Sequence, residues 1–414
     1  MADSLFFSRD TRVFVRLTDQ DTLWEIPVLD GFSFSQATNA SEVSINEMAD
    51  ASGTSRRARQ MFNDSFAPAE WSFSTYARPY YDDSNNKDQS VEQVLWALLA
   101  GQAYYSSLGF KSGSAGGTAY VAQHASEGRQ VIDFDQSNKT TLGTADIWFL
   151  MGDSSDNATT NSRLTAYKIE GCVVNEASFD FDLDGIATIN WSGFGSIIKE
   201  VNAYAQDAAP SSAEVGDDLW VSLTDEAYSA SSVQLALKAN MGDSSGALIS
   251  TVAGIDNDDN YIRNRLSYLS ASSQATGGTA TLTLTGGSIS INNNITFVTP
   301  ETLGVVNQPL GHVTGTRTVG GSVTCYLNGE AGSSADLFSD LIGATTTITN
   351  KFNLTFSIGG GILDGVPAVQ FEMSNCHLEL PTHNIEDVIS LETTFHALPT
   401  SMAETDELIV SYAG

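Results

Sequence analysis

Apolar and polar residues alternate along much of the chain, with the period of two that is typical of half-buried β-strands. In AEWSFSTY (69–76) the two faces separate fully, into the sets Trp71, Phe73, Thr75 and Ser72, Ser74, Tyr76. The same alternation predicts strands in TRVFVRL (11–17), VIDFD (131–135), DIWFLMGD (146–153), RLTAYKIEGCVV (163–174), EASFDFDLDG (176–185) and IATINWSGFG (186–195). The chain is therefore expected to be mainly β.

Helical spacing replaces the alternation in two short segments. In the first, Ser90 is an N-cap candidate, and Gln93 completes a capping box. An apolar stripe at helical spacing follows, and Gly101 supplies the stop; the stripe consists of Val91, Val94, Leu95, Leu98 and Leu99. A second helix is expected from Ser334 to Gly343, with the apolar residues Leu337, Phe338, Leu341 and Ile342.

The order of these elements occurs twice along the chain. TRVFVRL has a counterpart in YIRNRLSYL (261–269), and GFSFSQAT in GSISINNN (287–294), where Ile289 and Ile291 take the places of Phe32 and Phe34. AEWSFSTYA corresponds to GGSVTCYLN (320–328), the first helix to the second, and AYKIEGCVVNEA to VQFEMSNCHLEL, which sets Cys376 opposite Cys172. The repeated order predicts an internal duplication, with one domain at 1–203, a second at 261–414, and a linker or decoration at 204–260.

Charge and motif content narrow the classes of function. The chain carries 50 acids against 19 Lys and Arg, a formal net charge of −31. Such a chain has few Lys and Arg side chains that could bind phosphates, and its negative charge repels a nearby polyanion. The three cysteines show no CxxC spacing, and the five histidines show no ligand spacing. No nucleotide-binding loop or nucleophile elbow occurs, and no apolar run approaches the length of a membrane span. We therefore expect no enzymatic activity, no cofactor, no metal ion and no membrane partner.

One acidic segment resembles the start of a calcium-binding loop. Asp180, Asp182, Asp184 and Gly185 match the start of a calcium-binding loop, but its twelfth position, normally Glu, is Trp191. Alternation with Phe179, Phe181 and Leu183 favours a strand with one apolar and one acidic face.

The only cluster of basic residues in the sequence is Arg56, Arg57 and Arg59. Contact with a DNA backbone is one interpretation. A mobile basic arm that docks on an acidic neighbour is the favoured one. The arm lies in a long polar stretch (36–62) with Glu42 and Glu47, and a second such stretch (292–318) contains Glu301.

Three segments resemble a known family. RQMFNDSFAPAEWSFSTYARPY (59–80), GGSISINNNITFVTPETL (286–303) and HLELPTHNIEDVISLETTFHALPT (377–400) are similar to the major tail tube protein of long-tailed siphophages, in the variety with a duplicated tube domain. The resemblance implies two tandem β-sandwich domains, each flanked by a short α-helix, whose inner sheets form a β-barrel around a lumen on oligomerisation. It implies stacked trimeric, pseudo-hexameric rings in the virion tail, assembled in the bacterial host cytoplasm. The implied partners are other copies of the chain, a tape measure protein inside the tube, and tail terminator and tail-tip proteins. Genomic DNA would pass through without being bound.

Residue roles follow from combining this resemblance with the strand pattern. We expect Asp180, Asp182, Asp184, Glu176 and Glu379 to line the lumen, where they would repel passing DNA. We expect Arg56, Arg57, Arg59, Glu42, Glu47 and Glu301 to make contacts between rings. Two other classes stay open: a tail-tip or adhesin protein that binds a host receptor or glycan, and a glycan depolymerase with paired carboxylates.

Overall fold

The computed structural model describes residue 8 and residues 11–17, 23–43, 59–82, 87–101, 104–105, 109–110, 121–123, 130–134, 142–151, 162–206, 219–222, 261–274, 277–303, 305–343, 351–359, 368–385 and 387–413. This part of the chain is mainly β, as the alternation predicts, and contains two α-helices. Neither helix has the length or the apolar content to span a bilayer.

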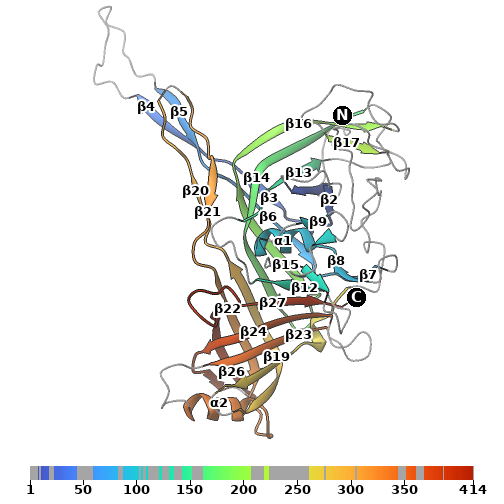
Figure 1. Ribbon diagram of the computed structural model, residues 1–414, viewed down its shortest axis with the longest axis vertical. Helices are drawn as coiled ribbons and strands as arrows, with labels where there is room; N and C mark the ends of the chain where they lie inside the picture. Colours follow the sequence, from blue (N-terminus) through green and yellow to red (C-terminus); the bar gives the residue numbers. More distant parts are fainter. Residues whose placement is uncertain are drawn as a thin grey trace, which may run out of the picture.

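The largest sheet, called the long sheet below, crosses most of the molecule (Figure 1). In order of pairing it contains β3 (Ser33–Ser35), β6 (Ala69–Tyr76), β15 (Thr188–Gly195), β14 (Ser162–Phe181), β19 (Thr279–Asn292), β22 (Thr318–Tyr326), β26 (Ile389–Ala397) and β25 (Thr382–Ile385). Every neighbouring pair is antiparallel. The strands come from both ends of the chain, so the sheet forms only when segments that are distant in the sequence pair with each other.

Two further groups of strands continue from β14 and β19. The first is β2 (Leu23–Ile26), β1 (Arg12–Leu17), β13 (Ala145–Met151), the N-terminal half of β14, β16 (Ile197–Gln206) and β17 (Leu219–Ser222). The second is β18 (Tyr268–Ser273), β23 (Phe352–Ile358), β24 (Val369–Leu378), β27 (Ile409–Tyr412), β12 (Gln130–Asp133) and β11 (Val121–Gln123). Their apolar residues and those of the long sheet form one continuous core.

The helix α1 (Gln93–Ala100) lies inside this core, and all eight of its residues are buried. The Trp96 ring meets Trp191 edge to face, with centroids 4.9 Å apart. Trp96 Nε1 donates to the Tyr412 hydroxyl at 2.8 Å, and that hydroxyl donates to a Glu92 carboxylate oxygen at 2.7 Å. Burial raises the pKa of Glu92 from 4.5 to about 7. The helix therefore contacts residues that are far from it in the sequence, Trp191 and Tyr412.

The start predicted for α1 is wrong. Ser90 is the last residue of β8 (Lys87–Ser90), and Glu92 precedes the helix without a side-chain capping bond. Gln93, which suggested a capping box, makes a tertiary contact instead: its Oε1 accepts from Gln130 Nε2 at 2.9 Å. The predicted end is confirmed, because Gly101 takes the left-handed conformation with φ 74°. The second helix, α2 (Ser334–Gly343), spans the predicted residues and packs on β18 and β19.

Both long polar stretches contain hairpins, called the arms below. β4 (Thr38–Val43) pairs with β5 (Gln60–Phe66), and β20 (Thr296–Val298) pairs with β21 (Gly311–Val313). Figure 1 shows them extending together from one side of the molecule. The Phe66 N–H donates to the Asn307 carbonyl at 2.8 Å, and the Asn307 N–H donates to the Asp64 carbonyl at 3.2 Å. Two smaller hairpins join β7 (Pro79–Asp82) to β8 and β9 (Tyr104–Tyr105) to β10 (Gly109–Phe110).

Two strand predictions need correction. The segment 261–269 is not a strand: it contains a 3-10 turn at Asn264–Leu266, and β18 begins at Tyr268. Its backbone instead closes the turn after β14, where the Ala187 N–H donates to the Ile262 carbonyl at 2.9 Å. The predicted strands 163–174 and 176–185 form the single strand β14, which ends at Phe181.

Part of the predicted linker forms strands. β16 extends to Gln206, beyond the expected boundary at 203, and β17 pairs with it in parallel. The rest of 204–260 lies outside the described residues.

Candidate functional site: the polar face of the long sheet

One face of the long sheet is polar over several strands. Residues on this face pair in rows, of which one runs Ser74, Asn190, Ser178, Ser290, Gly320, His396. Asn190 Nδ2 donates to the Ser178 hydroxyl and to the Asp180 carboxylate, both at 3.3 Å. The opposite face of the same strands carries buried aromatic residues such as Phe73, which packs in the core. Period-two alternation thus places small polar groups on one surface and the core on the other.

The polar face is acidic and lacks strong cations. Strand register puts three of the predicted lumen residues on it, Glu176, Asp180 and Glu379, because they align with Ser192, Thr188 and Thr394. Glu70 and Glu392 lie on the same face and were missed, since each is the lone acid of its strand. No Lys or Arg occurs in β3, β6, β15, β19, β22, β25 or β26, nor at 176–181. His396 lies on this face, with its Nε2 3.7 Å from Glu379 Oε1.

The prediction that Asp182 and Asp184 lie on the acidic face of a strand is wrong. Both lie in the exposed turn that follows β14, and Leu183 between them is 45% exposed rather than facing the core. The alternation fails there because β14 ends at Phe181 and the chain reverses. Asp184 Oδ1 lies 3.7 Å from Arg265 Nη2, and both side chains are exposed.

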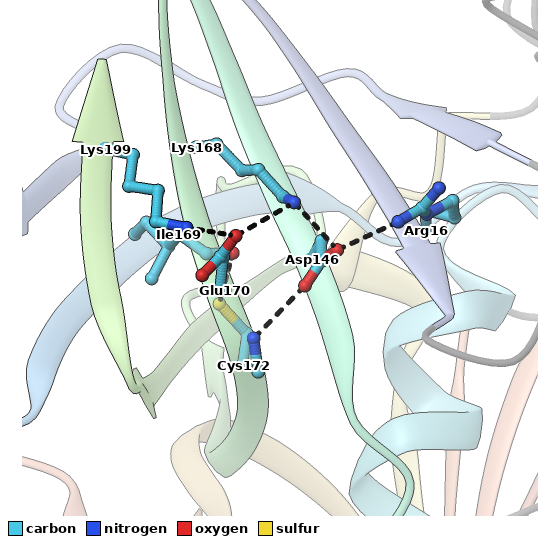
Figure 2. A network of polar contacts seen from close by, with 8 residues as sticks. Arg16, Asp146, Lys168, Ile169, Glu170, Cys172 and Lys199 are labelled. Carbon is cyan, nitrogen blue, oxygen red and sulfur yellow. Dashed lines mark hydrogen bonds and ion pairs between the residues drawn. The ribbon is translucent and has the colours of Figure 1, made fainter. Parts of the chain in front are cut away.

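A buried ionic network holds β14 where it passes from one strand group to the long sheet (Figure 2). Asp146 accepts from Arg16 Nη2 at 3.0 Å and from the Gly171 N–H at 3.1 Å, and lies 3.2 Å from Lys168 Nζ. The Lys168 side chain is only 4% exposed and also contacts Glu170 at 3.2 Å. Gly171 adopts φ 60°, which a glycine reaches without strain. No local sequence pattern indicates this network, because its members lie on three different strands.

The arms bring together some of the predicted contact residues. Arg59 Nε donates to Glu42 Oε1 at 2.7 Å, so these two residues pair with each other across the β4–β5 hairpin. Glu301 is exposed in the other arm, while Arg56, Arg57 and Glu47 lie outside the described residues. The sequence analysis did not identify the exposed apolar residues of the two arms, because both segments are polar on average. These residues are Met61, Phe62, Leu303, Val305 and Leu310.

A pocket of about 580 Å³ lies between the base of the β20–β21 arm and the loop before β27, and few reactive side chains line it. Its buried acid, Glu407, lies 3.9 Å from Arg317 Nη1. Arg317 also donates to Asn293 Oδ1 at 3.1 Å and to the Phe134 carbonyl at 3.0 Å. These charged groups are committed to one another and hold two parts of the fold together.

The described residues form a mainly β fold whose largest sheet has a core-facing side and an acidic, polar side. No protein-family model matches the chain. The chain is 29% identical over 409 residues to Tail tube protein pb6 of Escherichia phage T5, in an alignment covering 98% of this chain and 75% of that protein. This similarity relates the chain to a protein of a phage tail tube.

Proposed function

We propose that the chain is the repeating subunit of a siphophage tail tube, in which two tube domains (1–203 and 261–414) are joined by 204–260. Three chains would form a pseudo-hexameric ring, and stacked rings would form the conduit through which DNA is ejected. The observation that carries this proposal is the acidic, polar face of the long sheet, taken together with the similarity to a tail tube protein.

Strand pairing supports the duplication. Seven pairings occur twice in the same order: β1–β2 and β18–β19, β1–β13 and β18–β23, β13–β14 and β23–β24, β3–β6 and β19–β22, β6–β15 and β22–β26, β14–β15 and β24–β26, β14–β16 and β24–β27. Each arm lies between equivalent strands, as does each helix. We refer to the two sets as the first and the second copy.

The cysteines supply a residue-level anchor. Cys172 pairs with Ala145 and Cys376 with Phe352, and in both strand pairs the register shifts at the next residues. Cys172 Sγ lies 3.4 Å from the carbonyl oxygen of Ile169, and Cys376 Sγ lies 3.9 Å from that of Met373, three residues earlier in each case. This agrees with the alignment of the two cysteines made from sequence.

The strands of the long sheet can also be aligned between the two copies by counting residues from Cys172 and from Cys376. The row Val174, Gly193, Trp71, Phe34 corresponds to the row Leu378, Phe395, Gly321, Ile289. Each row contains a glycine beside an aromatic ring, where an added Cβ would lie 2.6 Å from Trp71 or 3.0 Å from Phe395. Phe34 is thus the counterpart of Ile289, a shift of two residues from the alignment of the apolar pattern.

The negative charge of the proposed ring would let DNA pass through without binding to the channel wall. Three chains of formal charge −31 would carry −93 per ring. With Glu70, Glu176, Asp180, Glu379 and Glu392 directed into a narrow channel, DNA phosphates would meet like charge on described strand segments that contain no Lys or Arg. The arms, with their exposed apolar residues, would connect stacked rings. A tape measure protein would fill the channel before ejection, and terminator and tail-tip proteins would close its ends.

Negative-stain microscopy and sedimentation of the purified chain test this proposal. We expect rings or tubes with a central channel. Compact monomers at all concentrations would contradict it, and monomers that bind a receptor glycan would favour the tail-tip or adhesin alternative.

A further inference from the structure

The buried network on β13 and β14 holds an amine between two carboxylates (Figure 2). Lys168 Nζ lies 3.2 Å from Asp146 Oδ2 and 3.2 Å from Glu170 Oε1. The Lys168 side chain is 4% exposed and that of Asp146 is 11% exposed. An ammonium and a carboxylate buried together lose much of their hydration, so this ion pair is destabilised relative to a neutral group of the same shape.

A β-bulge sets the geometry of this site. The register between β13 and β14 shifts at Asp146, which stands opposite the two residues Glu170 and Gly171. The Gly171 N–H donates to Asp146 Oδ1 at 3.1 Å, and Arg16 Nη2 donates to Oδ2 at 3.0 Å. Each oxygen of the Asp146 carboxylate therefore faces a hydrogen-bond donor in addition to the amine. Bulges often re-aim side chains in this way beside reactive sites.

The Trp148 ring closes one side of the site. Its side chain is fully buried, and both Lys168 Nζ and Arg16 Cζ lie over the ring, 5.2 Å and 5.3 Å from its centroid. A ring in this position keeps water away from the contact between Lys168 and Asp146. Exclusion of water favours condensation of an amine with a carboxylate, because water is the product and hydrolysis is the reverse reaction.

We propose that Lys168 and Asp146 become joined by an isopeptide bond between Nζ and Cγ, with Glu170 as the general base. Glu170 Oε1 accepts a proton from Lys168 Nζ, and the freed electron pair attacks Asp146 Cγ. Arg16 Nη2 and the Gly171 N–H stabilise the negative charge that develops on the Asp146 oxygens, as an oxyanion hole does. One C–O bond then breaks, and that oxygen leaves as water with the proton from Glu170 and a second proton from Nζ. An ammonium and a carboxylate become one amide and one water, so atoms and charges balance without another reactant.

Proximity supplies the driving force that this reaction lacks between free molecules in water. Well-oriented groups of one molecule react as if at effective concentrations of about 10⁵–10⁸ M. The two strands already hold the Lys168 amine against the Asp146 carboxylate, and the product replaces two buried charges with a neutral amide. The bond would close the chain between 146 and 168 into a covalent loop, which stabilises the fold by restricting the unfolded chain.

The second copy keeps the register shift without these reactive groups. In the alignment of the two copies, Glu372 takes the place of Lys168, and Asn353 that of Asp146. Asn353 Oδ1 accepts there from Gln274 Nε2 at 2.7 Å. A bulge at this point of the fold thus requires neither an amine nor an ionised carboxylate. Nucleophile, base and electrophile occur together in the first copy, and we expect one bond per chain.

Mass spectrometry of the denatured chain tests the proposal. After incubation of the folded wild-type chain at neutral pH, we expect a mass lower than that of the sequence by one water, and a branched peptide containing Lys168 and Asp146 after protease digestion. Lys168→Arg keeps the cation and should restore the full mass, whereas the matched control Lys199→Arg should keep the loss. Asp146→Asn should lose one ammonia in place of one water, because the amide nitrogen is then the leaving group. Glu170→Gln should slow bond formation by about 10²–10⁴-fold.

Two results would overturn the isopeptide bond. One is a wild-type mass that stays equal to that of the sequence, a measurement that does not depend on the folding of any variant. The other is a loss of one water that persists in Lys168→Arg, as expected for a succinimide at an Asp–Gly step; these steps are Asp30–Gly31, Asp184–Gly185 and Asp364–Gly365. Neither result bears on the assembly of rings, so the proposed tube function is tested separately.

Discussion

Replacing Glu92 with glutamine should make the stability of the chain less dependent on pH. The Glu92 side chain is 1% exposed and accepts a hydrogen bond from the Tyr412 hydroxyl at 2.7 Å. Burial raises its pKa from 4.5 in a solvated chain to about 7 in the folded protein, and the hydrogen bond from Tyr412 opposes this shift only partly. Folding therefore favours the protonated carboxyl.

The sign and size of the effect follow from proton linkage. Below pH 4.5 Glu92 is protonated in both states, and its contribution to stability is fully present. As pH rises towards 7 the unfolded chain releases the proton and the folded chain keeps it, so the free energy of unfolding falls by about 1.4 kcal/mol per pH unit. The total loss through this carboxyl is about 3 kcal/mol. Glutamine cannot ionise and keeps an oxygen that can accept from Tyr412.

Urea unfolding at pH 5 and pH 8, on protein kept below its assembly concentration, measures this difference. Relative to wild type, Glu92→Gln should gain about 2–3 kcal/mol more at pH 8 than at pH 5. Glu379→Gln, at an exposed position, controls for the general effect of removing an acid from a chain of charge −31. An equal Glu92→Gln effect at both pH values would refute the reasoning.

Further predictions concern the support of the long sheet. Asp146→Ala should destabilise the chain by about 3–5 kcal/mol, because it removes one of the two carboxylates that lie 3.2 Å from the buried Lys168 Nζ. Lys199→Ala, at a 43%-exposed side chain, should cost less than about 1 kcal/mol. Urea unfolding distinguishes the two variants, and equal effects would contradict a buried network. Gly193→Ala should lower the free energy of unfolding by about 1–3 kcal/mol or more. The added Cβ would lie 2.0 Å from the Val173 carbonyl oxygen and 2.6 Å from the Trp71 ring. A thermal unfolding midpoint equal to that of wild type would contradict this packing.

Local pattern was enough to predict the strand content and the orientation of the sheet faces. In AEWSFSTY the alternation alone separates Trp71 and Phe73 from Ser72 and Ser74, because one side of the sheet is solvated and the other is core. The same rule correctly placed Asp180 on the polar face. It failed at Asp182, since a period of two carries no information on where a strand reverses.

Features that depend on distant residues could not be read in this way. The capping box at Ser90 was wrong because Gln93 and Glu92 bind Gln130 and Tyr412, which are far away in the sequence. The bond between the arms joins Phe66 to Asn307, and no local pattern indicates it.

The central claim is that two copies in each chain form a pseudo-hexameric ring with the polar face of the long sheet turned inward. A cryo-EM reconstruction of tubes assembled from the purified chain tests it most directly. The account predicts three chains per ring, with Asp180 and Glu379 on the channel wall. Six chains per ring, or a polar face turned to the outside of the tube, would contradict it.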